Sequence, residues 1–116
     1  TGGYQLDRPG YSYAPTILTD VTSNMPAYHE ELFGPVAIVI KASEPAHALG
    51  IANGVNFGLG GSIWTNDLAT AETMARGMES GATFVNNFSF SDPRMPFGGV
   101  KNSGYGRELS ANGIHR

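Results

Sequence analysis

The 116-residue chain contains no cysteine. This absence excludes a disulfide scaffold, a thiolate metal site and a cysteine nucleophile within these residues. The chain also lacks a long apolar run, because the clearest one, at residues 36–40, is far shorter than the roughly 20 residues that cross a membrane. Residues 1–8 have neither the basic start nor the apolar stretch of a secretory signal. We therefore expect a cytoplasmic protein that is not held in a membrane.

Charge is scarce as well. Charged residues make up 15% of the chain, and seven Lys and Arg face ten Asp and Glu, which gives a formal net charge of -3. The four basic residues of positions 81–116 are spread singly, whereas a nucleic-acid surface needs clustered bases to displace counterions from phosphates. The three histidines are too far apart to share a helical face, and no carboxylates stand at a metal-binding spacing. The sequence thus predicts no nucleic-acid partner and no metal site.

Apolar residues are plentiful enough for a core, at 41% of the chain, and 10% of the residues are aromatic. The length suits one small domain over residues 1–116. Val36–Ile40 is an apolar, mostly β-branched run, which is typical of a strand buried on both faces. Ser43 is expected to cap a helix that ends near Gly54, and Asp67 is expected to cap a second helix that Gly81 stops.

Two more strands are expected after these helices, at residues 61–65 and 82–85. The order predicts an α/β fold with a parallel-sheet β-α-β-α-β core, in which three strands share one sheet and the helices pack on it. Outside the core we expect a short strand at residues 16–19, a turn of helix or shaped loop within 25–34, and a last short helix at 108–114.

The composition changes abruptly at residues 86–106, which are rich in glycine, proline and asparagine with interleaved Phe. A loop of this length inside a small domain is usually functional or disordered, and the aromatic residues argue against disorder. It follows a predicted strand of a parallel sheet, and such sheets bind ligands beyond the carboxyl ends of their strands. The loop is therefore the first candidate for a site.

Two segments use many residues that fix backbone shape: residues 29–36, with adjacent acids before Phe-Gly-Pro, and residues 96–108. Together they resemble the C-terminal part of the catalytic domain of NAD(P)-dependent aldehyde dehydrogenases. Glu30–Pro35 matches the family motif E-E-x-F-G-P, and Pro96–Glu108 matches P-F-G-G-x-K-x-S-G-x-G-R-E at every fixed residue. Asn53–Gly60 resembles the family's N-x-x-x-Y-G-L stretch, with Phe57 in place of Tyr, and Tyr13–Leu18 resembles the family's segment before the first motif. The likeness therefore covers nearly the whole chain.

The resemblance implies that Glu31 holds the hydroxyls of the nicotinamide ribose of NAD or NADP, because a carboxylate can accept two hydrogen bonds from a vicinal diol. It implies that Phe33 lies beside the nicotinamide and limits the movement of that ring. The alternative is that Glu31 is a solvated charge at a helix end and that Phe33 belongs to the core.

The same resemblance places Phe97 on the wall of the aldehyde tunnel and Glu108 near the general base, as a member of a proton relay. The alternatives are plain core packing for Phe97 and an ion pair with Arg107 or another base for Glu108. The stretch Phe90–Phe97 is most similar to succinate-semialdehyde dehydrogenases, in which a Ser six residues before the Phe contacts the substrate carboxylate. Ser91 stands at that place.

The family's thiol nucleophile, its glutamate general base and its dinucleotide-binding domain all precede this region in a family chain. The expectation is therefore a fragment, inactive alone, of a homo-oligomeric enzyme that oxidises an aldehyde to the acid with NAD or NADP. The implied chemistry is thiolate attack, hydride transfer to the nicotinamide and hydrolysis of the thioester. Two alternatives stay open: a CoA-acylating relative, and a non-catalytic α/β interaction module derived from the family.

Overall fold

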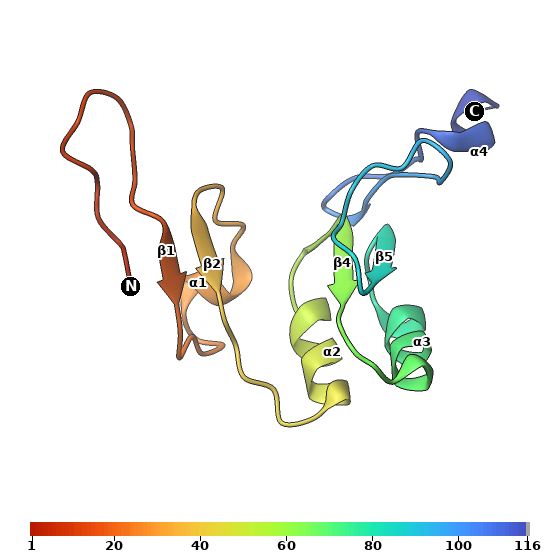
Figure 1. Ribbon diagram of the computed structural model, residues 1–116, viewed down its shortest axis with the longest axis horizontal. Coiled ribbons are helices and arrows are strands. Elements are labelled where there is room, and N and C mark those ends of the chain that lie inside the picture. The colour runs from red at the N-terminus through yellow and green to blue at the C-terminus, as the bar shows by residue number, and fades with distance from the viewer. Residues whose placement is uncertain (116) are drawn as a thin grey trace. The chain divides into compact units, whose positions relative to one another are not determined.

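The computed structural model describes residues 1–115 and divides the chain into two compact units, residues 1–42 and residues from 43 onward. Each unit is described by itself. Figure 1 shows their helices and strands along the chain.

The first unit is built on two short parallel strands, β1 (Thr16–Leu18) and β2 (Val36–Ile38), with Thr16 opposite Val36 and Leu18 opposite Ile38. A single turn of helix, α1 (Pro26–His29), lies in the crossover between them, as the sequence indicates. Residues 1–15 fold back on β1: the Thr16 hydroxyl donates to the carbonyl of Ala14 at 2.8 Å and accepts from the N–H of Gly3 at 2.8 Å. The β1–β2 pair therefore organises this unit.

The α/β class with parallel strands is confirmed, but the expected single sheet has to be corrected. Within the described residues β2 pairs with β1, and the strands of the second unit pair among themselves. Strand β2 is also shorter than the expected residues 36–40. This apolar run is not buried on both faces, since Val39 is 56% exposed. An apolar run indicates that both faces of a segment are hydrophobic, but it does not specify the partner strand.

The second unit is centred on two parallel strands, β4 (Gly60–Ile63) and β5 (Ala82–Val85), joined by helix α3 (Leu68–Gly77). Helix α2 (Pro45–Asn53) precedes them and packs against α3, as Figure 1 shows. The buried core contains Ile63 of β4 and Ala71 of α3. The strand-helix-strand arrangement expected for residues 61–85 is therefore present.

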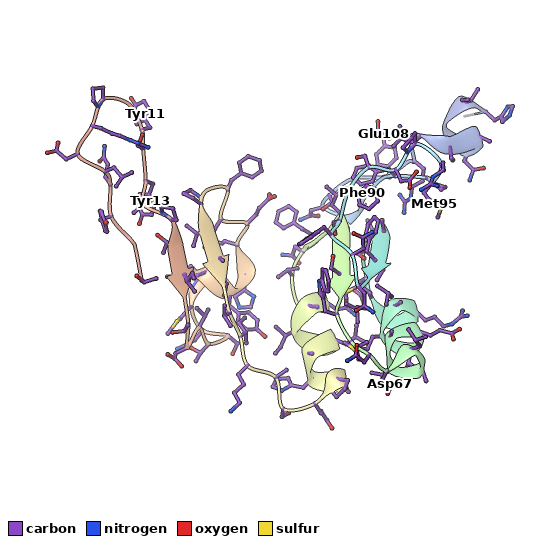
Figure 2. All side chains as sticks on the ribbon, in the orientation of Figure 1. Tyr11, Tyr13, Asp67, Phe90, Met95 and Glu108 are labelled. Atoms are coloured by element: carbon purple, nitrogen blue, oxygen red, sulfur yellow. The ribbon has the colours of Figure 1, made fainter. Side chains whose placement is uncertain are left out.

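The start of α3 is capped as predicted. Asp67 stands directly before α3 (Figure 2). Its carboxylate accepts hydrogen bonds from the backbone N–H groups of Ala69 (3.0 Å) and Thr70 (3.2 Å) and from the Thr70 hydroxyl (2.6 Å). These bonds, with the Thr70 hydroxyl first, lower the pKa of Asp67. The cap thus satisfies two of the backbone donors that the first turn of a helix leaves open.

Two other predicted boundaries are wrong. The N-cap of α2 is Glu44, because the hydroxyl of Ser43 lies 3.1 Å from Nδ1 of His47 instead of on the helix N–H groups. Helix α3 ends at Gly77, before Gly81. Gly81 has another role: a Cβ built there would lie 1.6 Å from the carbonyl oxygen of Gly98. It allows two stretches of backbone to touch.

The long segment after β5 is ordered by two antiparallel contacts. Its strand β6 (Val100–Lys101) pairs with β3 (Phe57–Gly58), and Phe97 pairs with Glu108 through an isolated bridge. Helix α4 (Ser110–Ile114) follows, slightly later than the expected start. Figure 1 shows this segment extending beyond the strands of the second unit. No helix among residues 1–115 is long and apolar enough to cross a membrane.

The contact at Gly81 gives a stability prediction. Gly81→Ala should destabilise the protein by about 1–3 kcal/mol, because the added methyl collides with main chain that cannot turn away. The matched control is Gly50→Ala in the interior of α2, where a Cβ meets nothing within 4 Å. This control should stabilise the protein by about 0.5–1 kcal/mol. Thermal unfolding measures both, and a Gly81→Ala variant with an unchanged Tm would contradict the close contact.

Candidate functional site

The first motif lies between α1 and β2, in a chain shaped by two tight turns. The N–H of Gly34 donates to the carbonyl of Leu32 at 2.7 Å, and the N–H of Val36 donates to the carbonyl of Gly34 at 2.8 Å. Each is a three-residue turn, and the first is centred on Phe33. As a result the ring of Phe33 protrudes from the unit and is 94% exposed.

Glu31 stands two residues before Phe33 in the same extended stretch and is also exposed. Among the described residues its carboxylate takes part in no ion pair. Both side chains are thus available to a ligand: a carboxylate that accepts hydrogen bonds, and an aromatic face. The alternative of core packing is wrong for Phe33 in this chain, whereas the roles of both residues toward a cofactor stay predictions.

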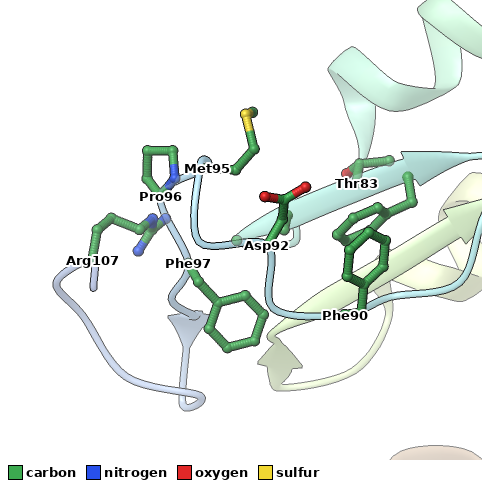
Figure 3. Close-up of a pocket in the computed structure, with 10 residues that line it drawn as sticks. Thr83, Phe90, Asp92, Met95, Pro96, Phe97 and Arg107 are labelled. Atoms are coloured by element: carbon green, nitrogen blue, oxygen red, sulfur yellow. The ribbon is translucent and has the colours of Figure 1, made fainter. Parts of the chain in front are cut away.

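The second unit contains a hollow of about 340 Å³ beside β5, within the range of roughly 300–1,000 Å³ that is common for small-molecule sites. Figure 3 shows it between β5 and the loop that follows. The rings of Phe84 and Phe90 lie against each other in its wall, with centroids 5.3 Å apart. The residues that line it are Gly81, Ala82, Thr83, Phe84, Phe90, Asp92, Met95, Pro96, Phe97 and Arg107.

Phe97 is held in this wall by main-chain bonds. Its N–H donates to the carbonyl of Glu108, and the N–H of Glu108 donates to the carbonyl of Phe97, both at 2.8 Å. The pairing joins the two ends of the second motif, so that Phe97 and Glu108 are neighbours although eleven positions apart in the sequence. Because the backbone fixes the position of Phe97, its side chain faces the hollow without taking part in the pairing (Figure 3).

The glutamate of the same pair is exposed. The ion pair weighed for Glu108 is absent: in the described part of the chain Arg107 makes no ion pair with it. Instead Nη1 of Arg107 donates to the carbonyls of Gly99 (2.8 Å) and Gly106 (2.6 Å). Arg107 therefore braces the glycine turn, and the carboxylate of Glu108 stays available.

Ser91 is exposed and lies between Phe90 and Asp92, both of which line the hollow. Over residues 1–115 the lining includes Phe97 but not Ser91. Asp92 was missed by the sequence reasoning. The available signal was the Asp-Pro-Arg turn sequence directly after the aromatic residues, which indicates a carboxylate with a base two positions later.

Lys101 was also missed. Its ammonium group donates to the carbonyls of Asn53 (2.7 Å) and Val55 (3.0 Å) and lies 2.6 Å from Oε2 of Glu79. The amide of Asn53 joins the same cluster, because it donates to Gly77 at 2.8 Å and accepts from the N–H of Glu79 at 2.9 Å. The cluster ties the ends of α2 and α3 to β6.

Residues 1–115 contain no cluster of three or more His, Cys, Asp or Glu side chains that could hold a metal ion. The two motifs belong to different units: Glu31 and Phe33 to the first, and Ser91, Phe97 and Glu108 to the second. The second unit thus combines a mostly apolar hollow, the ion pair between Asp92 and Arg94, and the exposed carboxylate of Glu108.

Comparison with known proteins identifies what these parts are similar to. Residues 1–116 match the model of the aldehyde dehydrogenase family. The probable succinate-semialdehyde dehydrogenase of Synechocystis sp. is 50% identical over 113 residues, which are 97% of this chain and 25% of that protein. Succinate-semialdehyde dehydrogenase 1 of Mycobacterium tuberculosis gives the same identity and the same coverage. The names of both specify NADP(+).

Solved structures agree. The succinic semialdehyde dehydrogenase of Streptococcus pyogenes in complex with NADP+ matches with a TM-score of 0.92 and 43% identity, over 98% of this chain and 25% of that one. The betaine aldehyde dehydrogenase of Staphylococcus aureus in complex with NAD+ matches with a TM-score of 0.90 and 32% identity, over 99% and 24%. The chain thus spans about a quarter of the length of the relatives it matches.

The hydrogen-bonded cluster around Lys101 gives a prediction for the stability of the second unit. Lys101→Met keeps the aliphatic stem but removes an ammonium group whose hydrogen bonds are each of order 1.5–3 kcal/mol, so we expect a loss of about 2 kcal/mol. Lys41→Met is the matched control, because Lys41 is exposed and forms no ion pair in residues 1–115, and it should shift stability by less than about 0.5 kcal/mol. Equal unfolding midpoints for the two variants would exclude a bracing role for Lys101.

Proposed function

The chain belongs to the aldehyde dehydrogenase family, and from this we propose that it is about a quarter of an enzyme that oxidises succinate semialdehyde to succinate with NADP or NAD. The observation that carries the proposal is the 50% identity, across 97% of the chain, to relatives named as succinate-semialdehyde dehydrogenases. The NADP(+) in those names favours NADP over NAD. We propose further that both units belong to one catalytic domain.

The first motif fits the nucleotide. Glu31 offers an exposed carboxylate that can accept from both hydroxyls of a ribose, and Phe33 offers a ring that is 94% exposed. The nicotinamide, when bound, supplies the acceptor of the hydride. In our proposal Glu31 fixes the position of the ribose, and Phe33 restricts the space in which the attached ring can turn. Both act by orientation, which is a large part of what a protein contributes to cofactor chemistry.

The hollow of the second unit fits a small aldehyde. Its aromatic wall, with Phe84, Phe90 and Phe97, can exclude water from the reacting carbon, which protects a thioester from early hydrolysis. Ser91 is proposed to hydrogen-bond the far carboxylate of the substrate, from the loop stretch between two lining residues. The exposed carboxylate of Glu108 is proposed to accept a proton from the general base, as a relay member close to Phe97.

The nucleophilic thiol has to come from elsewhere in the protein, because these 116 residues contain no cysteine. The aldehyde substrate and the rest of the parent chain are therefore the proposed partners. A cytoplasmic location and a homo-oligomeric state stay predictions for the whole protein.

The function is tested by an assay of the whole enzyme. We expect oxidation of succinate semialdehyde with reduction of NADP, measured as absorbance of the reduced nicotinamide, and a lower kcat/KM with betaine aldehyde, which carries a positive charge. The 116-residue chain by itself should oxidise no aldehyde, because it has no thiol. A whole enzyme that accepts betaine aldehyde but not succinate semialdehyde would overturn the proposed substrate, and one that reduces no nicotinamide with any aldehyde would overturn the activity.

A second prediction concerns Glu31 in the whole enzyme. Glu31→Gln keeps the shape but weakens two charge-assisted hydrogen bonds to the ribose, so hydride transfer or cofactor affinity should fall by about tenfold to a hundredfold. Acylation of the thiol by the aldehyde should change little, because that step precedes the use of the nicotinamide. Single-turnover absorbance and cofactor titration measure the two quantities.

The neighbouring acid provides the matched control. Glu30 is also exposed, and it caps the end of α1 only through its backbone N–H, which donates to the carbonyl of Pro26 at 3.1 Å. Glu30→Gln should therefore leave both quantities unchanged. If Glu31→Gln behaves like Glu30→Gln, Glu31 is a surface acid and its role toward the ribose is withdrawn.

A further inference from the structure

We propose that the ion pair between Asp92 and Arg94 sets the charge that the aldehyde hollow presents to the far end of the substrate, and so permits an anionic aldehyde. This inference rests on the proposed function, because it concerns which aldehydes the same hollow accepts. It assigns a specificity role to two residues of the loop after β5.

The geometry separates the two partners. The Asp92 side chain lines the hollow and is 12% exposed, whereas the Arg94 side chain is 85% exposed. Figure 3 shows the Asp92 carboxylate among the labelled lining residues, between Thr83 and Pro96 in this view. The carboxylate is thus the inner partner and the guanidinium the outer one.

The ion pair between Asp92 and Arg94 is bidentate. Nη2 of Arg94 donates to Oδ2 of Asp92 at 2.6 Å, and Nε donates to Oδ1 at 2.9 Å. The backbone N–H of Arg94 also donates to Oδ1 at 2.9 Å. These bonds, with the guanidinium first, lower the pKa of Asp92 to about 2. The carboxylate is therefore ionised at any pH at which the enzyme would be assayed.

An ionised carboxylate in the wall would repel the carboxylate of succinate semialdehyde. The wall also contains Arg107, whose Nη1 donates to the carbonyls of Gly99 and Gly106 and whose charge is the same in every variant compared below. Most of the remaining lining is apolar, and charges near a low-dielectric surface are screened less than in water. Arg94 supplies the compensating charge at hydrogen-bond distance, so that the pair is neutral as a whole. Ser91 is the residue directly before this pair, so the proposed carboxylate contact is made beside a pair whose net charge is zero.

A second reading of the pair is purely structural. The N–H of Met95 donates to the carbonyl of Asp92 at 3.0 Å, which closes a turn over residues 92–95. If the pair served only that turn, its loss would affect aldehydes of every charge alike. The two readings therefore differ in how the effect depends on the charge of the substrate.

The test is a charge series on the whole enzyme. Arg94→Gln keeps a shorter side chain that can still hydrogen-bond, and it removes the charge that compensates Asp92. For succinate semialdehyde we expect kcat/KM to fall about tenfold, mainly through KM, the effect of one partly screened charge. For butanal, which has the same number of carbons and no charge, the change should be less than about twofold. The double variant Asp92→Asn with Arg94→Gln removes both charges and should restore the ratio between the two substrates.

The matched control is Arg76→Gln on α3, which breaks the exposed pair between Arg76 and Glu72, whose Nη2 and Oε1 atoms lie 2.7 Å apart. Neither residue lines the hollow, and the variant should change neither substrate. Equal losses for both aldehydes in Arg94→Gln, or a double variant that stays selective against the anion, would overturn the inference. The proposed function is judged separately, on the wild type: failure to oxidise succinate semialdehyde overturns it before any variant is compared, and the inference falls with it.

Discussion

Backbone lying directly on backbone is the constraint on which the second unit depends. At Gly81 the carbonyl oxygen of Gly98 stands 1.6 Å from where a Cβ would be, and at Gly58 the carbonyl oxygen of Glu79 stands 2.3 Å from it. No residue with a side chain fits at either place. The contact at Gly81 holds the loop after β5 against the start of that strand, and the contact at Gly58 holds β3 against the segment before β5. The hollow is the space that remains between β5 and the loop. Its shape is thus set by main chain, while its chemical character is set by side chains such as Phe97 and Asp92.

The sequence predicts the local elements well. The cap at Asp67 and the strand at residues 82–85 both depend on neighbours within a few positions, and the structure has each of them. The expectation that residues 36–40 share one sheet with residues 61–65 and 82–85 was wrong, because an apolar run does not specify which strand lies beside it. Ser43 does not cap α2, because its hydroxyl lies 3.1 Å from Nδ1 of His47 instead of on the backbone N–H groups of the helix.

The candidate site also contains features that the sequence indicates and contacts that it does not. The motif match directed attention to residues 96–108, and the structure puts Phe97 in the wall of a hollow. The roles of Glu31, Phe33, Ser91, Phe97 and Glu108 toward ligands stay predictions. Asp92 was missed although its partner Arg94 is only two positions away. The setting of Lys101 was not predicted, because its partners are the carbonyls of Asn53 and Val55, almost fifty positions earlier. Long-range contacts to backbone atoms leave no mark on residue type at the accepting end, so no pattern in one sequence reveals them.

The bridge between Phe97 and Glu108 uses only main-chain atoms, and this has an evolutionary consequence. Because neither side chain contributes to the hydrogen bonds that join the two strands, either can be replaced without unpairing them. Selection can then alter the wall of the hollow and the nearby acid independently of the scaffold. A loop with this construction lets descendants of one ancestor diverge in the aldehydes they accept while they inherit the same backbone.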